Sequence, residues 1–410
     1  MAFTRYDTLG MMVSLLFFIV SSPWCALKNL PKLNFFAHCW LHRIACKVEG
    51  TDGRLKMNRS IRSKFVVAGL LLFSLPIAAS PRQPNVSNKT QEKKSKLSKI
   101  LPCRVKPNLD FMNAANGEYA HEHFLSAAWF ARAVQLPNET RKEHWQALEQ
   151  QPISIKDFYA GPFGLHATLL EFDRKVLLLY RGTQDPLDYI LNAAFFTSPG
   201  WVHRLPGWVH KGFLINFGLS WRQIRGTLKQ MANQGKTVTF AAHSLGGVLS
   251  QYAAWRAEED GIAVDRVYAF QAPNAGDETF RDAFENRFAG RSANLIFGED
   301  LTPHIPPTRE SFREFADATM RVLSGPLSAI VRQAKYAALA ERFRLSDSGH
   351  VEPITTEDIT HSEKAFWSSY KQKTGGKAFP KGLGPESAFI ADHNVERVVC
   401  TLAKATADNY

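Results

Sequence analysis

The pattern of apolar and polar residues along the chain predicts strands that alternate with helices. Short apolar runs between turn residues predict strands, and apolar residues recurring every three or four positions predict helices. The expected strands are Gly164–Phe172, Lys175–Tyr180, Thr237–Ala242, Val264–Gln271 and Asn294–Phe297. The expected helices are His123–Gln135, Phe213–Asn233, Gly247–Glu259, Glu278–Phe288 and His393–Ala405. This alternation is typical of an α/β fold, with a mostly parallel central sheet covered by helices on both faces.

After Pro307 the alternation is lost. Ala316–Phe343 has helical spacing, with a break expected at Gly325-Pro326. Gly349–Ala391 is predicted to be mostly loop. We interpret residues 308–390 as either an insertion within the domain or a cap over it, and the pattern favours neither.

The first 106 residues differ in charge from the rest of the chain. They hold eighteen Lys and Arg against four Asp and Glu, a net charge of +14, whereas residues 107–410 carry −2. This nearly neutral part offers no basis for binding a polyanion, so we expect no nucleic-acid partner. Residues 80–106 are rich in Lys, Ser and Pro without aromatics, which predicts a flexible linker. We therefore expect the globular domain to span residues 107–410.

Residues 57–79 have the three parts of a signal peptide. A basic segment follows Met57, the apolar run Phe65–Leu75 comes next, and small residues end at Ala79. We predict cleavage near Ala79, a secreted or periplasmic protein, and no transmembrane span in the mature chain. The apolar run is shorter than the about 20 residues of a membrane span, and an uncleaved membrane anchor is the alternative. Because a complete signal starts at an internal methionine, we interpret residues 1–56 as a mis-assigned upstream extension.

The predicted mature chain keeps two cysteines, Cys103 and Cys400. In an oxidising compartment they either form one disulfide or remain two buried thiols. No CxxC or Cys/His spacing typical of zinc occurs, so we expect no metal, and we expect no cofactor.

Ser244 stands where the expected strand Thr237–Ala242 turns into a helix. Such a tight turn holds a serine hydroxyl above the sheet edge, and the backbone N–H of the next residue, Leu245, points toward an oxyanion on the attacked carbonyl. Small residues are needed two positions before and after the serine, and Ala242 and Gly246 meet that need. By itself this motif also occurs in glycine-rich turns that carry a surface serine.

Five segments in order carry further motifs: Tyr180–Thr183, His210–Phe213, Ala242–Gly247, Tyr268–Asp277 and Gly298–Pro307. Together with the segment around His393 they resemble the class 3 lipases, the α/β-hydrolase family of triacylglycerol lipases. The chain departs from the family pattern at Gln271 and Ala242, where the family has Gly. The resemblance implies an α/β-hydrolase fold with a lid and a C-terminal insertion before the last helix.

The resemblance and the chemistry of the residues assign the same catalytic roles. A serine hydroxyl becomes a nucleophile when a histidine takes its proton, and that histidine needs an orienting carboxylate. In α/β-hydrolases the order along the chain is serine, acid, histidine. We therefore predict Ser244 as the nucleophile, Asp300 as the acid and His393 as the base. Thr183 and Leu245 are predicted to form the oxyanion hole.

Neighbouring residues compete for these roles. Glu299 is the alternative acid, and His361 is the alternative base. The remaining candidates are expected to be structural, exposed or wrongly placed: Asp277, His304, His350, His243 and Arg181.

The segment between Thr183 and His210 holds more apolar side chains than a solvated loop exposes: Leu191, Phe195, Phe196, Trp201, Leu205 and Trp208. In the family this segment is the lid, a flap that covers the acyl pocket and opens on a lipid surface. A buried hairpin is the alternative. The basic stretch Arg321–Arg344 is typical both of a helix on an anionic lipid surface and of a covering helix with a solvated charged face.

We therefore predict a secreted serine hydrolase, similar to triacylglycerol lipases, that cleaves lipid esters at a lipid–water interface through an acyl-enzyme on Ser244. The alternatives are a phospholipase A1 or a carboxylesterase for soluble esters. A third possibility is a lipase-like fold that binds lipid without catalysis. The sequence does not indicate an oligomeric state.

Overall fold

The computed structural model describes Cys103 and residues 105–160, 165–182, 196–319, 335–339, 341–376 and 386–407. These residues lie in one compact unit, Leu97–Tyr410. The predicted upstream extension, the signal peptide and nearly all of the linker lie outside the described residues. So do Thr183 and the first part of the predicted lid.

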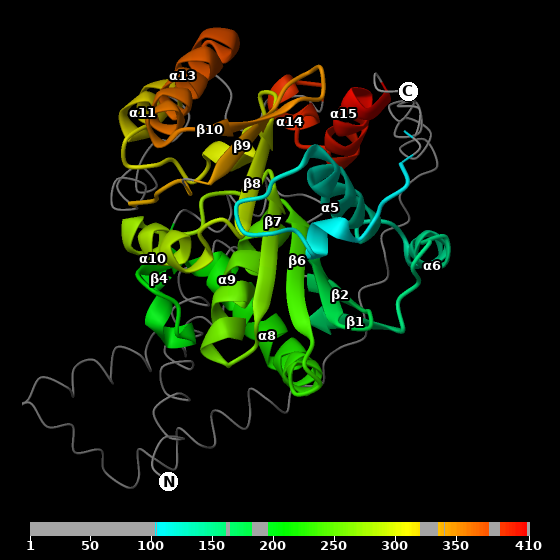
Figure 1. The fold of residues 1–410 in the computed structure, drawn as a ribbon. Helices are drawn as coiled ribbons and strands as arrows, with labels where there is room; N and C mark the ends of the chain where they lie inside the picture. Colours follow the sequence, from blue (N-terminus) through cyan, green and yellow to red (C-terminus); the bar gives the residue numbers. More distant parts are fainter. Residues whose placement is uncertain are drawn as a thin grey trace, which may run out of the picture. The chain divides into compact units, whose positions relative to one another are not determined.

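An eight-stranded sheet forms the centre of this unit (Figure 1). Its strands, in spatial order, are β1 (Ser154–Ala160), β2 (Leu165–Glu171), β3 (Lys175–Tyr180), β6 (Thr237–His243), β7 (Val264–Phe270), β8 (Ser292–Phe297), β9 (Arg342–Leu345) and β10 (Val351–Ile354). The strands from β3 to β9 run parallel to one another, while β1, β2 and β10 pair antiparallel at the two edges.

Helices cover both faces of the sheet. On one face lie α8 (Lys211–Ala232) and α9 (Leu245–Glu259), which share a buried cluster with Val176 and Leu178 of β3. On the other lie α5 (His121–Ala133) and α15 (Val395–Ala407), which share a buried cluster with Leu177 and Leu179 of the same strand. Successive side chains of a strand point to opposite faces, so an uninterrupted apolar strand supplies both layers of the core. The predicted α/β-hydrolase fold class is confirmed.

Shorter elements complete the unit. The helices are α6 (Asn138–Gln146), α10 (Glu278–Phe288), α11 (Phe312–Thr319), α13 (Thr356–Thr374) and α14 (Ala388–Ala391), with the 3-10 turns η2 (Asp110–Met112), η3 (Gly200–His203) and η4 (Thr302–His304). The strands β4 (Thr197–Pro199) and β5 (Trp208–His210) form a separate two-stranded sheet. None of the helices within the described ranges is long and apolar enough to cross a membrane.

The prediction for the region after Pro307 was wrong in two places. The end of the expected helix Ala316–Phe343 belongs to β9, which pairs parallel with β8. Pairing against a buried strand outweighs the weak helical pattern of this short segment. Residues 308–390 therefore contribute two strands to the main sheet.

The predicted loop region Gly349–Ala391 contains β10 and two helices. The longer helix, α13, starts at the N-cap Thr355, whose hydroxyl accepts a hydrogen bond from the Asp358 N–H at 3.1 Å. It ends at Gly375, whose φ of 64° favours glycine. Its buried face is apolar except for Glu363, and this charged residue interrupts the apolar spacing from which a helix would be predicted.

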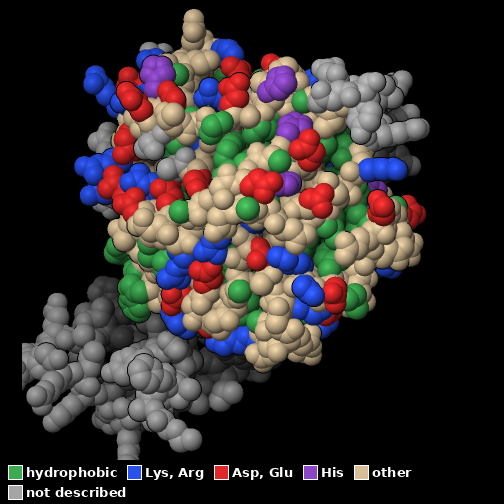
Figure 2. Space-filling model, viewed as in Figure 1, with side chains coloured by type: hydrophobic (Ala, Val, Ile, Leu, Met, Phe, Trp, Pro, Cys, Tyr) green, Lys and Arg blue, Asp and Glu red, His purple; other side chains and the backbone are tan. Residues whose placement is uncertain are grey.

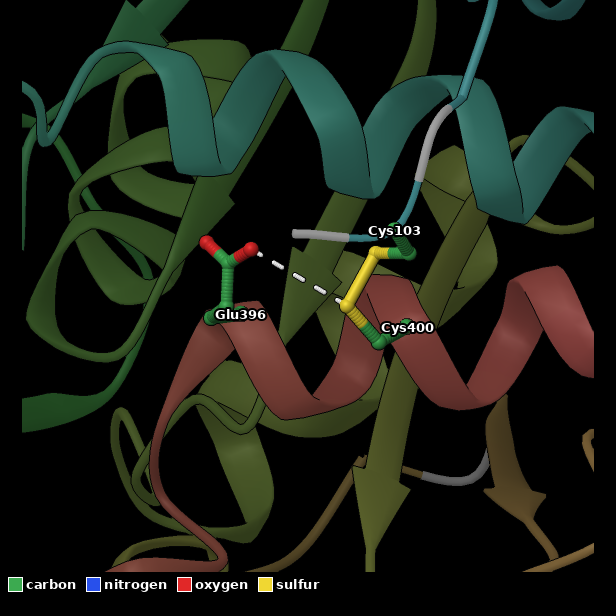
Figure 3. Close-up of side chains that lie close together, drawn as sticks. All are labelled: Cys103, Glu396 and Cys400. Carbon is green, nitrogen blue, oxygen red and sulfur yellow. Dashed lines mark hydrogen bonds between the residues drawn. A yellow bond between two sulfur atoms is a disulfide. The ribbon is translucent and has the colours of Figure 1, made fainter. Parts of the chain in front are cut away.

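A disulfide joins Cys103 to Cys400 in α15, which settles the open question about the two cysteines (Figure 3). The bond ties the segment before α5 to the last helix. The Glu396 carboxylate lies 3.9 Å from the Cys400 sulfur and also pairs with Arg132 of α5. Cys103, Glu396 and Cys400 lie close enough together to be considered as metal ligands. Because the two sulfurs are bonded to each other, neither cysteine offers a thiolate to a metal.

Candidate active site

The turn after β6 holds Ser244 in an unusual backbone conformation. Its φ of 59° lies in a region that residues other than glycine seldom adopt. The turn is held by the Ser244 N–H, which donates to the carbonyl of Phe270 at 2.8 Å. A Cβ at Gly246 would lie 2.5 Å from the carbonyl oxygen of Tyr180 and 3.2 Å from the Ala242 methyl. Glycine is therefore required after the serine, while the extra methyl of Ala242 fits before it.

Three of the predicted site residues lie within hydrogen-bond reach of one another. His393 Nε2 is 2.8 Å from Ser244 Oγ, and His393 Nδ1 is 2.7 Å from Asp300 Oδ2. The carboxylate can accept only from a protonated Nδ1, and that tautomer leaves Nε2 free to accept from the serine hydroxyl. The other Asp300 oxygen accepts from the Thr302 N–H at 2.9 Å. Ser244, Asp300 and His393 are 1%, 2% and 8% exposed, so water scarcely reaches these bonds.

The alternative acids lie elsewhere. Glu299 is paired with Lys373 at the surface. Asp277 is the N-cap of α10, where its Oδ1 accepts from the Phe280 N–H at 3.0 Å.

The alternative bases also have other surroundings. His350 and His361 are exposed. His304 is buried, stacks on Phe366 with ring centroids 3.7 Å apart, and lies 3.1 Å from the Glu363 carboxylate. Of the four histidines that follow Asp300 in the chain, His393 is the one within hydrogen-bond distance of Ser244.

The predicted oxyanion donors are described only in part. Leu245 is the first residue of α9, so its N–H lies at the positive end of the helix dipole. Thr183 lies outside the described residues. Its neighbour Gly182 is close to the nucleophile, because a Cβ built there would be 3.4 Å from Ser244 Cβ and 3.0 Å from the His243 carbonyl oxygen.

One polar group near the serine was not predicted. The Gln135 side-chain nitrogen would lie 3.1 Å from a Cβ on Gly182. It is buried, and among the residues that the structure describes it has no hydrogen-bond partner. Gln135 follows α5 more than a hundred residues before Ser244, and no motif surrounds it, so the sequence carried no signal for this proximity.

Several apolar side chains are exposed just before β4, on η3 and on β5, in the part of the predicted lid region that the structure describes. Trp201 is 74% exposed, Trp208 52% and Phe196 43%, whereas Leu205 is buried at 3%. Figure 2 shows hydrophobic side chains gathered at the lower left, where β4 and η3 lie in Figure 1. We call Phe196, Trp201 and Trp208 the aromatic patch. A group of exposed aromatics of this kind is typical of a contact surface.

Comparison with known proteins relates the central part of the chain to a known family. The family model for lipase (class 3) matches residues 177–310, from β3 through the loop after η4. No curated protein sequence matches the chain.

Three solved structures of fungal lipases are similar in fold. The triacylglyceride lipase of Rhizomucor miehei is 15% identical, with a TM-score of 0.47, over 67% of this chain and 95% of that one. A lipase of Yarrowia lipolytica is 15% identical, with a TM-score of 0.39, over 55% and 78%. A lipase of Rhizopus microsporus var. chinensis is 17% identical, with a TM-score of 0.38, over 45% and 68%. Residues 177–310 match the class 3 lipase family, and this match supports a triacylglycerol lipase-like ester hydrolase.

Proposed function

We propose that the chain cleaves carboxylic esters of lipids through an acyl-enzyme on Ser244. One observation carries the proposal: the hydrogen bonds run unbroken from Ser244 through His393 to Asp300, at 2.8 and 2.7 Å. This order of hydroxyl, imidazole and carboxylate activates a serine, because the imidazole takes the proton while the carboxylate stabilises the resulting imidazolium. The family match over residues 177–310 supports the same chemistry.

In the first half-reaction Ser244 Oγ bonds to the ester carbonyl carbon and its proton passes to His393 Nε2. The carbonyl oxygen becomes an oxyanion, which the Leu245 N–H and, by our prediction, Thr183 stabilise. The bond to the alcohol then breaks, and His393 returns the proton to the departing oxygen. In the second half-reaction water attacks the acyl-serine, gives its proton to His393, and the serine oxygen recovers a proton as the carboxylic acid leaves.

Two observations favour a water-insoluble ester as the substrate. Ser244 is 1% exposed, so an ester reaches it only after part of the covering chain moves. The aromatic patch, with Trp201 and Trp208 more than half exposed, offers a surface that a lipid aggregate would cover. Contact with such an aggregate would bury the apolar area of the patch, and would thereby favour the state in which the covering chain has moved away from Ser244.

We also propose that the enzyme is exported and that residues 57–79 are removed as a signal peptide. Residues 80–106 then remain as a linker before the domain at 107–410. The disulfide between Cys103 and Cys400 supports this, because such bonds persist in oxidising compartments. Mass spectrometry of the protein from the medium or periplasm tests it, with a new N-terminus after Ala79 as the expected result. A protein retained in the membrane with residues 57–79 attached would contradict it.

A fluorophosphonate probe, which bonds to activated serines, tests the nucleophile. We expect labelling of the wild type and none of Ser244→Ala. The matched control is Ser250→Ala, because Ser250 is also a buried serine of this region but sits within α9 with no hydrogen-bond partner for its hydroxyl among the described residues. It should be labelled like the wild type. Equal labelling of the wild type and Ser244→Ala would remove Ser244 from the nucleophile role.

A substrate panel then tests the ester class. Emulsified long-chain triacylglycerol, phosphatidylcholine vesicles and short soluble esters are compared with the same enzyme preparation. We expect the highest turnover on the emulsion. Faster release of fatty acid from phospholipid, or a preference for soluble esters, would replace the triacylglycerol assignment with a phospholipase A1 or a carboxylesterase.

A further inference from the structure

Gln271, the first residue after β7, occupies a backbone position that favours glycine. Its φ is 51°, in the left-handed region, and the residue is fully buried. Its own N–H continues the sheet by donating to the Leu295 carbonyl at 2.8 Å. A glutamine at such a position costs free energy through its strained backbone and through the burial of its polar amide group. The contacts of its side chain have to offset both costs.

The Gln271 carboxamide bridges two groups that flank the predicted base and nucleophile. Its oxygen lies 3.1 Å from Nε2 of His243, the residue before Ser244. Its nitrogen donates to the backbone carbonyl of Asp392, the residue before His393. One side chain therefore spans from the nucleophile turn to the loop that carries the base.

The His243 ring fits this bridge as a neutral group. It is buried, and burial together with nearby His393 lowers its pKa well below the ordinary value. A neutral ring has one N–H, and placing that hydrogen on Nε2 satisfies the Gln271 oxygen. The ring centroid of His243 lies 4.5 Å from that of His393, so His243 also forms one wall behind the base.

Asp392 extends the connection to the loop of the predicted acid. One oxygen of its carboxylate accepts from the Glu299 N–H at 2.9 Å, and the other pairs with Arg397. Gly298 has a φ of 60°, and a Cβ there would lie 2.2 Å from the Asp392 carboxylate. The loops of Ser244, Asp300 and His393 are thus held to one another through Gln271 and Asp392.

We propose that Gln271 is a positioning residue that holds His393 at bonding distance from Ser244. The inference rests on the proposed function, in which His393 is the general base. Without the carboxamide, the Asp392 carbonyl loses its donor and His243 loses its acceptor. The loop of His393 is then free to move, and a displacement near 1 Å of a catalytic group lowers turnover by about 100-fold.

The test compares Gln271→Gly and Gln271→Glu with the wild type on a short soluble ester. Glycine accepts the backbone conformation and removes the bridge. Glutamate keeps an acceptor for His243 but cannot donate to the Asp392 carbonyl while ionised. We expect kcat to fall by about 10-fold to 100-fold in each variant, with KM within about 2-fold, because the substrate-contacting surface is unchanged.

A spectroscopic readout separates positioning from general destabilisation. The proton between His393 Nδ1 and Asp300 gives a far-downfield proton resonance, identified by its loss in His393→Ala. We expect this resonance to shift or broaden in both Gln271 variants at temperatures well below their melting points. The matched control is Gln251→Ala, a buried glutamine of α9 whose side-chain oxygen has no hydrogen-bond partner in the described part of the chain. It should change melting temperature without altering kcat or the resonance.

The outcomes are distinguishable. Wild-type kcat and an unshifted resonance in Gln271→Gly or Gln271→Glu would overturn the positioning role, even if Ser244→Ala is inactive. A loss of kcat that only follows a loss of folded protein, as judged by circular dichroism, would overturn it as well. If the wild type hydrolyses no ester, the proposed function fails, and the resonance still reports whether Gln271 sets the His393–Asp300 bond.

Discussion

Replacing Cys103 and Cys400 by serine is expected to lower the free energy of unfolding while leaving the site intact. The disulfide joins residues 297 positions apart, so it strongly restricts the unfolded chain. The chain-entropy relation for such a loop gives about 6 kcal/mol at 25 °C. Unfolded chains keep residual structure, and removal of native disulfides commonly costs about 2–5 kcal/mol, so we expect a loss in that range.

Urea unfolding followed by circular dichroism measures this loss. The double serine variant should unfold at a lower urea concentration than the oxidised wild type, and the wild type with a reductant should approach the variant. At 25 °C without urea, kcat on a soluble ester should stay within about 2-fold of the wild type, because the bond acts mainly on the unfolded state. Equal urea midpoints for the variant and the oxidised wild type would refute the reasoning.

Two further predictions concern the core and the surface. Glu363→Gln should cost about 3–5 kcal/mol in urea unfolding, because it leaves Arg342, bonded to Glu363 at 2.7 Å, as an uncompensated buried charge. Burial raises the pKa of Glu363, but its basic partners outweigh burial and lower that pKa overall. The stabilisation by Glu363 is therefore present above about pH 4.3, the pKa of an unfolded glutamate, and is lost as the pH falls through the lower pKa of the folded state. Urea unfolding of both proteins at pH 7 and pH 3 checks this sign, and an equal loss of stability in Glu363→Gln at both pH values would contradict it. The double variant Trp201→Ala, Trp208→Ala should bind a lipid emulsion at least about 10-fold more weakly in a sedimentation assay, because both side chains are more than half exposed and available to the lipid. Its kcat on a soluble ester should stay unchanged. Unchanged binding to the emulsion would exclude the aromatic patch as the lipid contact.

Elements decided by local pattern were predictable from the sequence. Lys175–Tyr180 and Glu278–Phe288 begin and end where the apolar pattern placed them, and β6, its turn and α9 were recognised within a few residues. The nucleophile motif is local as well, because a sharp strand-to-helix turn needs small residues at fixed offsets from the serine. Local propensity and periodicity act over a few residues, which is the range that a sequence pattern reports.

Contacts between distant segments were decided by the tertiary structure. β9 is a strand because β8 offers it a buried edge, and α13 is a helix with a glutamate inside because Arg342 reaches that glutamate. The Cys103–Cys400 bond and the bridge made by Gln271 likewise depend on chain segments more than a hundred residues apart.

The site itself divides in the same way. The sequence alone determined the strand–turn–helix that presents Ser244, together with a short set of acids and histidines ordered along the chain. The fold alone decided which imidazole and which carboxylate meet that hydroxyl, since His393 lies 149 residues from Ser244 and 93 from Asp300. Over such separations the parallel sheet brings the carboxyl ends of β6 and β8 to one edge, and α15 packed on α5 places the loop of His393 there.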